Sequence, residues 1–152
     1  MCLVDDSDGR CTVLHSRQQR ARLRHRCTEC GRDVQAGEIY LAERTVFDGA
    51  AMSHKICAHC QRVRAYLMDH CSGWMYQGLG DDISGHYYST LSNDADDRES
   101  RLLNLGMTAR WRRADGALWP VPRGETPNVA VERAAEGRPL EPLVPPHREE
   151  QE

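Results

Sequence analysis

The middle of the chain carries a hairpin pattern followed directly by a helical pattern. Residues 39–47 and 51–56 mix apolar and polar side chains, and the Asp48-Gly49 pair between them favours a tight turn. From residue 58 onward, apolar side chains recur at positions i, i+3 and i+4: Val63, Tyr66 and Leu67. The pattern therefore predicts a β-hairpin that leads into a helix, with the helix ending at residues 71–73.

Two further helices and a second hairpin are predicted after this one. Residues 79–91 place apolar side chains at four-residue intervals: Leu79, Ile83, Tyr87 and Leu91. Residues 95–105 follow, where Asn93 or Asp94 can cap a helix and Gly106 can end it. Residues 111–119 predict a short hairpin about an Asp-Gly turn.

The two ends of the chain differ from this middle region. Residues 1–14 form an acidic lead-in, in which residues 11–14 can form a short strand. All seven prolines lie at or after residue 120, among charged residues. Such a segment buries too little apolar surface to offset its ordering entropy. We expect a zinc-stabilised domain over 15–119 and a mobile tail over 120–152, which is either simply solvated or a docking peptide.

Composition makes a structural staple plausible. The chain has 152 residues, a net charge of −3, and only one Phe, three Trp and five Tyr. A small domain with so few large apolar groups often needs a metal or another cross-link. No apolar run approaches the ~20 residues that cross a bilayer, and the N-terminus does not resemble a signal peptide. We therefore expect a cytoplasmic protein without a membrane partner, whose thiols stay reduced.

Two Cys-x-x-Cys motifs carry the clearest chemistry. They lie at Cys27–Cys30 and at Cys57–Cys60, with 26 residues between them. Four thiolates delivered as two pairs are the ligand set of a structural zinc site. Gly31 follows the first pair and suits the positive φ of a turn around a metal. We expect one zinc ion, held by these four sulfurs, and an α+β fold around it.

We call the two Cys-x-x-Cys turns, Cys27–Cys30 and Cys57–Cys60, the first and second knuckles. The order of the predicted parts resembles the treble-clef zinc fingers, in which a knuckle, a hairpin and a helix follow one another. The resemblance covers residues 22–70. A wider stretch, from Cys27 through Gly37-Glu38-Ile39-Tyr40 to Gly73-Trp74, is similar to short phage-encoded zinc proteins of unassigned function. The resemblance implies a bacterial or phage protein of the cytoplasm. With the elements predicted above, we expect a small treble-clef-like zinc module followed by two further helices, a C-terminal hairpin and a disordered tail. The resemblance implies no activity.

HNH nucleases share this scaffold, but the chain departs from their pattern. The family places a catalytic His at the end of the first hairpin strand, where this chain has Thr45-Val46-Phe47. A His commonly follows the last Cys in that family, and Gln61 stands there instead. The sequence therefore offers no obvious residue to act as the general base, and we expect no enzyme activity.

Other side chains offer weaker hypotheses. Arginines gather before the first knuckle and can contact phosphates: Arg17, Arg20, Arg22, Arg24 and Arg26. Lys55 is the single lysine of the chain, so a GC-rich genome can explain the arginine content as well. The helices over 79–91 and 95–105 with the last hairpin also fit the order of a winged helix-turn-helix, although acidic residues open its second helix.

Other cysteines and histidines allow more than one interpretation of their role. His54 and His59 are near the second knuckle and are expected to support the site rather than ligate it, and Cys71 is expected in the core. Cys2, Cys11 and His15 are spaced loosely for a second metal site. The leading expectation is an adaptor that binds a protein partner, plausibly a host protein. Nucleic-acid binding through the Arg17–Arg26 segment is the alternative, and an HNH-like nuclease comes third.

Overall fold

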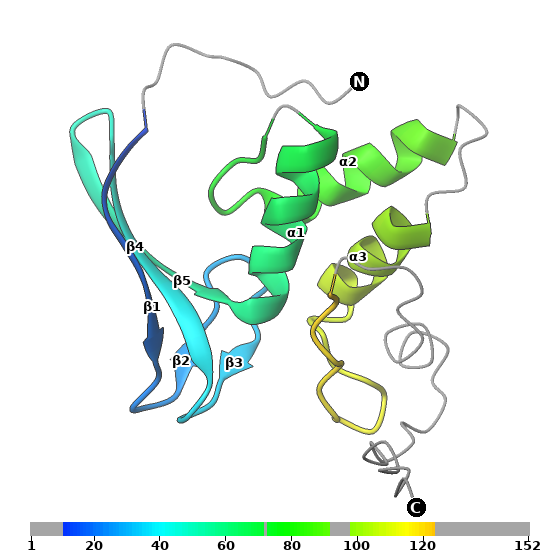
Figure 1. Ribbon diagram of the computed structural model, residues 1–152, viewed down its shortest axis with the longest axis horizontal. Coiled ribbons are helices and arrows are strands. Elements are labelled where there is room, and N and C mark those ends of the chain that lie inside the picture. The colour runs from blue at the N-terminus through cyan, green and yellow to red at the C-terminus, as the bar shows by residue number, and fades with distance from the viewer. Residues whose placement is uncertain (1–10, 72, 92–97, 124–152) are drawn as a thin grey trace, which may run out of the picture.

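The computed structural model describes residues 11–71, 73–91 and 98–123. Within them the chain forms antiparallel strands and three helices, which confirms the predicted mixture of the two. A curved three-stranded sheet lies on one side of the molecule, and the helices lie on the other (Figure 1). The expected caps at Asn93 and Asp94, residue Cys2, and the tail over 124–152 lie outside the described residues.

The larger sheet is built on the predicted hairpin. Its strands are β1 (Thr12–Arg20), β4 (Ile39–Phe47) and β5 (Ala50–Cys57), in the order β1-β4-β5. Asp48 and Gly49 connect β4 to β5 with positive φ angles of 47° and 76°, as a tight hairpin turn requires. Strand β1 is longer than the short strand predicted over 11–14, because its backbone pairs with β4 along nearly its whole length.

A second, two-stranded sheet frames the first knuckle. It consists of β2 (His25–Arg26) and β3 (Asp33–Val34), and the Cys27–Cys30 turn lies between them. Gly31 has a φ of 76°, which confirms the predicted left-handed position. The backbone N–H of Thr28 donates to the carbonyl of Lys55 at 2.8 Å, so the knuckle is fixed to the edge of β5.

The three helices are α1 (Ala58–His70), α2 (Leu79–Leu91) and α3 (Arg98–Thr108). The first two follow the sequence prediction. Helix α3 instead continues two residues past Gly106. It ends in a Schellman arrangement, in which the N–H of Trp111 bonds the carbonyl of Gly106 at 2.8 Å and Arg110 has a φ of 51°. The Trp111 indole packs against Gly106, which lies inside the helix and does not end it.

The predicted C-terminal hairpin is smaller than expected. Within residues 98–123 it contains one β-bridge, between Arg112 and Leu118, around a turn at Gly116. The reason is that Trp111 and Trp119 on either side of the turn are buried in the core, at 0% and 5% exposure, so this segment packs inward and adds no further ladder. The chain remains packed at least to Pro122, which is buried.

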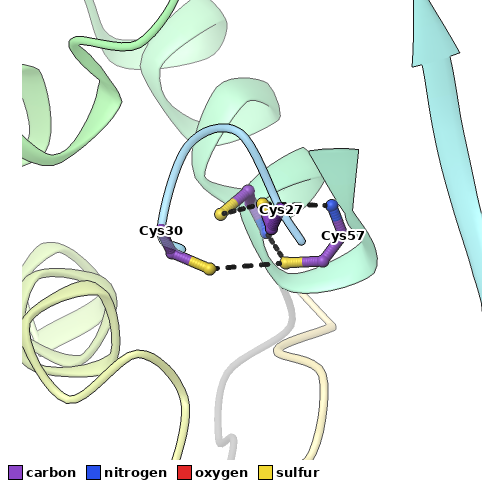
Figure 2. Close-up of side chains that lie close together, drawn as sticks. Cys27, Cys30 and Cys57 are labelled. Carbon is purple, nitrogen blue, oxygen red and sulfur yellow. Dashed lines mark hydrogen bonds between the residues drawn. The ribbon is translucent and has the colours of Figure 1, made fainter. Parts of the chain in front are cut away.

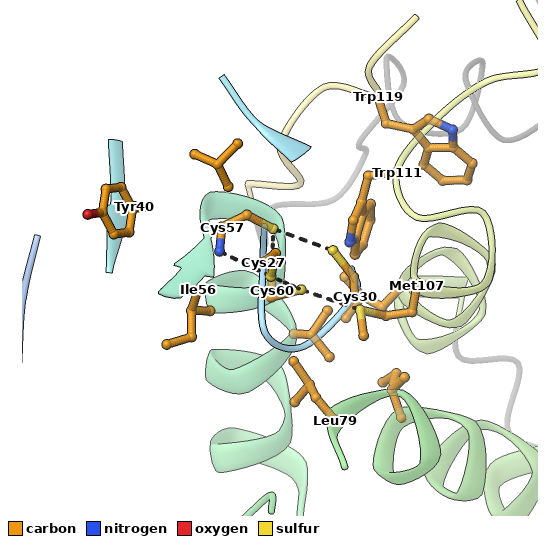
Figure 3. Packing of buried hydrophobic residues seen from close by; sticks show 14 of the residues in the cluster. Cys27, Cys30, Tyr40, Ile56, Cys57, Cys60, Leu79, Met107, Trp111 and Trp119 are labelled. Atoms are coloured by element: carbon orange, nitrogen blue, oxygen red, sulfur yellow. Dashed lines mark hydrogen bonds between the residues drawn. The ribbon is translucent and has the colours of Figure 1, made fainter. Parts of the chain in front are cut away.

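The core joins the cysteines to apolar side chains from every layer. Figure 3 shows the four cysteines beside Ile56, Leu79, Met107, Trp111 and Trp119. Trp111 and Trp119 are thus core anchors as expected, and Trp74 packs against the core while partly exposed. None of the helices in the described part of the chain has the length and apolar character needed to cross a bilayer.

Candidate metal centre

Four cysteines that are far apart in the sequence meet in one place. Cys27 and Cys30 come from the turn between β2 and β3. Cys57 ends β5 and is also the N-cap of α1, where its side chain accepts a hydrogen bond from the N–H of Cys60. The hairpin thus carries the second pair back to the first pair, as the spacing of the motifs predicts.

The four sulfurs form a compact, buried cluster (Figure 2). The Sγ atoms of Cys27 and Cys60 are 3.8 Å apart, and those of Cys30 and Cys57 are 3.9 Å apart. All four ligand atoms lie within 4.8 Å of one another, and all four residues are buried. Neither pair is a disulfide, because all four cysteines are free. The cluster can therefore hold one metal ion.

Backbone N–H groups favour thiolates at Cys27 and Cys57. The N–H of Cys57 lies 3.4 Å from the Sγ of Cys27, and the N–H of Cys60 lies 3.5 Å from the Sγ of Cys57. The Sγ of Cys57 also lies at the N-terminus of α1, where the helix dipole favours negative charge. Hydrogen bonds from the other three cysteines lower the pKa of Cys57 well below a thiol's usual value, whereas hydrogen bonds within the same cluster raise the pKa values of Cys30 and Cys60. A thiolate is the form of cysteine that binds metal.

Arg32 is the cation most closely built into this region. Its side chain is 1% exposed and bonds Glu38, at 3.0 Å from Nη2 to Oε1. Burial lowers the pKa of Arg32, but the bond to Glu38 and the charge on Cys57 outweigh it and keep the pKa above its usual value. The other basic residues beside the ligands in sequence lie nearer the surface: Arg26, Lys55 and Arg62.

The two histidines near the second knuckle lie outside the sulfur cluster, as expected. His59 is fully buried, its Nε2 lies 2.7 Å from the carbonyl oxygen of Trp119, and its Nδ1 lies 3.3 Å from Nη2 of Arg32. Because a carbonyl oxygen can only accept, Nε2 carries the ring proton and donates a hydrogen bond to the carbonyl of Trp119. His59 in this way fixes the C-terminal segment over the metal centre.

His54 is buried in β5, three residues before Cys57. Its Nε2 lies 2.9 Å from Oγ1 of Thr45, and its ring stacks on Tyr76 at a centroid distance of 4.3 Å. Burial, with the nearby charge of Arg64, lowers the pKa of His54. The His54 side chain is thus enclosed and 1% exposed.

A buried ion network next to the knuckle was not anticipated from the sequence. Arg64 of α1 donates to Glu29 and to Glu43, each at 2.9 Å, and its guanidinium lies 3.8 Å from the ring centroid of Trp74. The side chain of Glu29 is 0% exposed, although it lies inside the Cys-x-x-Cys turn. The hydroxyl of Tyr76 also donates to Glu43, at 2.9 Å. The one sequence feature that points to this network is Glu29, a carboxylate that stands between Cys27 and Cys30.

The five arginines predicted to contact nucleic acid are all exposed, but they do not form one surface. Arg17 and Arg20 are three residues apart in β1, so they lie on opposite faces of the sheet. Arg22 and Arg24 lie in the bend after β1, and Arg26 belongs to β2. The segment is therefore neither a single helix nor a single strand, and its five arginines share no single face.

The remaining expected sites have simpler outcomes. Among residues 11–71, 73–91 and 98–123, the four-cysteine group is the one cluster of His, Cys, Asp and Glu suited to a metal. Cys11 and His15 are both exposed and belong to no such group. The Sγ of Cys71 lies 2.9 Å from Nδ1 of His86, away from the cluster.

No protein-family model matches the chain, and the comparisons with curated proteins and with solved structures return no match. We therefore infer the function from the geometry of the molecule itself.

Proposed function

We propose that the cluster binds one zinc ion and that this zinc is structural. A tetrahedron with Zn–S arms of ~2.3 Å has edges of about 3.8 Å. The Cys27–Cys60 and Cys30–Cys57 sulfur distances of 3.8 Å and 3.9 Å agree with that edge. Four thiolates also select zinc over harder cations, which prefer oxygen ligands.

A closed site of this kind supports binding rather than catalysis. Catalytic zinc keeps one position open for water or substrate, whereas four protein sulfurs fill the coordination shell. The knuckle followed by a hairpin, with the second pair in the first turn of α1, also supports the treble-clef-like arrangement suggested by the sequence. The function proposed is that of a zinc-stabilised binding module without enzyme activity.

The first candidate partner is a protein, and the free end of the sheet supports it. Four apolar side chains are exposed there, at 37% to 59%: Val13, Leu14, Phe47 and Met52. Val13 and Met52 both pair with Thr45, so they share one face, and Phe47 lies two residues along on that face. An exposed apolar patch of this kind often marks a protein interaction site. We call these four residues the apolar tip.

Strand β1 adds a second feature suited to a protein partner. It is an edge strand of nine residues, and its outer side has no partner strand among the described residues. Such an edge can accept an added strand from another chain. The resemblance to phage-encoded zinc proteins makes a host protein of the bacterial cytoplasm the expected partner.

The test compares partner capture by three forms of the tagged, zinc-loaded protein in a nuclease-treated bacterial lysate. The wild type is expected to capture a defined host protein, and the double variant Phe47→Ser with Met52→Ser is expected to lose it. Met68→Ser is the control, because Met68 is 62% exposed on α1, away from the tip. Equal capture by all three forms would contradict a role for the apolar tip.

The alternative, nucleic-acid binding through the Arg17–Arg26 segment, receives little support from the dispersal of its arginines. Arg20 instead donates to the carbonyl of Gly37 at 2.7 Å, and Arg26 to the carbonyl of Gly31 at 3.0 Å. These bonds give both side chains a role in holding the turns around the metal centre.

A further inference from the structure

One face of the three-stranded sheet gathers cations that are far apart in the sequence. In the register of the sheet, His15, Arg44 and Ser53 lie in one row across β1, β4 and β5. Arg17, Ala42 and Lys55 lie in the next row. Directly paired residues and residues two apart in a strand point to the same side of a sheet. Three cations therefore share this side, and we call Arg17, Arg44 and Lys55 the cationic face.

The strands contribute no carboxylate to this side. Glu43 is the one acidic residue in β1, β4 and β5. It lies between Ala42 and Arg44, so its side chain points to the opposite side, where Arg64 and Tyr76 bind it. The acidic residues that flank β4 are Glu38, which is paired with Arg32, and Asp48 in the hairpin turn. The positive charge of the cationic face is thus not cancelled within the sheet.

The three cations are also free of ion pairs in the part of the chain that the structure describes. Arg17 bonds the amide oxygen of Gln19 at 3.2 Å, and Nζ of Lys55 lies 3.0 Å from Nδ1 of His25. Neither of these contacts involves a carboxylate. Arg44 is exposed. Five other arginines of the described residues do pair with carboxylates: Arg24, Arg32, Arg62, Arg64 and Arg113.

We propose that the cationic face binds the phosphate backbone of duplex nucleic acid. Unpaired Lys and Arg side chains in adjacent rows give the sequence-independent attraction on which phosphate contacts depend. Tyr40 on this side is 3% exposed and the imidazole of His15 is exposed, so the strands offer no exposed Phe, Tyr or Trp ring here for stacking unpaired bases. The face therefore suits a duplex, read by its backbone and without sequence preference. This site is separate from the apolar tip and does not depend on the proposed protein partner.

The experiment titrates the full-length, zinc-loaded protein into a fluorescent DNA duplex of about 20 base pairs of arbitrary sequence and follows anisotropy at several salt concentrations. Neutralising three phosphates predicts a slope of log K against log salt of about −2.7, or an affinity loss of about 40-fold between ~50 and ~200 mM salt. The double variant Arg17→Gln with Arg44→Gln is expected to bind more weakly, with a slope near about −0.9 and a loss of about 3-fold over the same range.

A charge-matched control separates this face from general basicity. Arg22→Gln with Arg101→Gln removes the same charge from exposed positions elsewhere and is expected to keep the wild-type slope. The tip variant Phe47→Ser with Met52→Ser is expected to keep duplex binding even where it loses the protein partner. The proposal is overturned if both arginine double variants lose affinity equally, or if the wild type fails to bind at ~50 mM salt and ~100 μM protein, concentrations at which nonspecific binding is measurable.

Discussion

The guanidinium of Arg64 donates from Nη2 to Oε1 of Glu29 at 2.9 Å, which ties helix α1 to the turn between the first two metal ligands. The same guanidinium donates to Glu43 of β4 and packs on Trp74. A single buried cation therefore connects the knuckle, the sheet and the segment after α1. The metal centre is held in register with the sheet by this network as well as by the thiolates.

The first prediction concerns this cation. Arg64→Met removes the charge while keeping much of the side-chain volume, so Glu29 and Glu43 lose their buried cation, and only neutral donors such as the hydroxyl of Tyr76 remain. Breaking one side of a buried ion pair typically costs about 3–5 kcal/mol. We expect a loss of this size in the free energy of unfolding, measured by urea denaturation of the zinc-loaded protein.

Arg62 provides a neighbouring control on the same helix. Its contact with Glu99 is 4.0 Å, and the two side chains are 32% and 29% exposed. Arg62→Met is expected to cost no more than about 1 kcal/mol, as half-exposed pairs usually do. Equal losses for the two variants would show that the Arg64 network has no special weight.

The second prediction is a pH dependence that originates at Glu43. Burial raises the pKa of Glu43, but hydrogen bonds from Tyr76 and Arg64 outweigh burial and hold the pKa below its usual value. A carboxyl whose folded pKa is depressed stabilises the fold above its unfolded pKa of about 4.3, and this stabilisation is lost as the pH falls through the folded pKa.

Glu43→Gln isolates this contribution, because any loss of metal in acid would be common to both proteins. We expect the stability advantage of the wild type over Glu43→Gln to be full near neutral pH and to shrink as the pH falls below about 5. Urea unfolding at a series of pH values measures that difference. A difference that stays constant with pH would rule out Glu43 as the source.

The third prediction concerns the packing of Trp111 on α3. A β-carbon at Gly106 would lie 2.6 Å from Cη2 of Trp111 and closer still to other atoms of the indole. Gly106→Ala is therefore expected to destabilise the protein by about 1–3 kcal/mol, the usual range for overpacking. Gly85 in α2 is the matched control, because nothing lies within 4 Å of a β-carbon built there.

Gly85→Ala is expected to stabilise the protein by about 0.4–1 kcal/mol, since it reduces the entropy of the unfolded chain at a helical position. Thermal and urea unfolding would then show a lower free energy of unfolding than the wild type for Gly106→Ala and a higher one for Gly85→Ala. Two variants that behave alike would contradict the close contact between Gly106 and Trp111.

The features that sequence predicted well all have local causes. The Asp48-Gly49 turn, the start of α1 beside Cys57 and each Cys-x-x-Cys motif depend on residues close together in the chain. Strand β1 was underestimated because its sequence, TVLHSRQQR, is mostly polar. It forms through its ladder with β4, so the signal for it lies in a partner strand, from Arg20 paired with Ile39 to Thr12 paired with Val46, 19 to 34 residues away.

The charged residues show the same limit more sharply. Neighbouring arginines in the Arg17–Arg26 segment diverge in space, whereas Arg17, Arg44 and Lys55 converge because the sheet register aligns them. Glu29 and Arg64 meet across 35 positions of sequence. Local composition predicts which residues are charged, but only the pairing of strands and helices determines which of these charges lie together.

The central claim is that one zinc ion, held by four cysteines, organises this fold. The most direct measurement combines metal content by native mass spectrometry with the unfolding transition of the wild type, Cys60→Ser and Cys11→Ser. We expect one zinc per chain and cooperative unfolding for the wild type and for Cys11→Ser, whose site is exposed and outside the cluster. Cys60→Ser is expected to lose both, because binding free energy here is folding free energy. A wild-type protein that stays fully folded, with an unchanged unfolding midpoint after its metal is removed, would contradict the account.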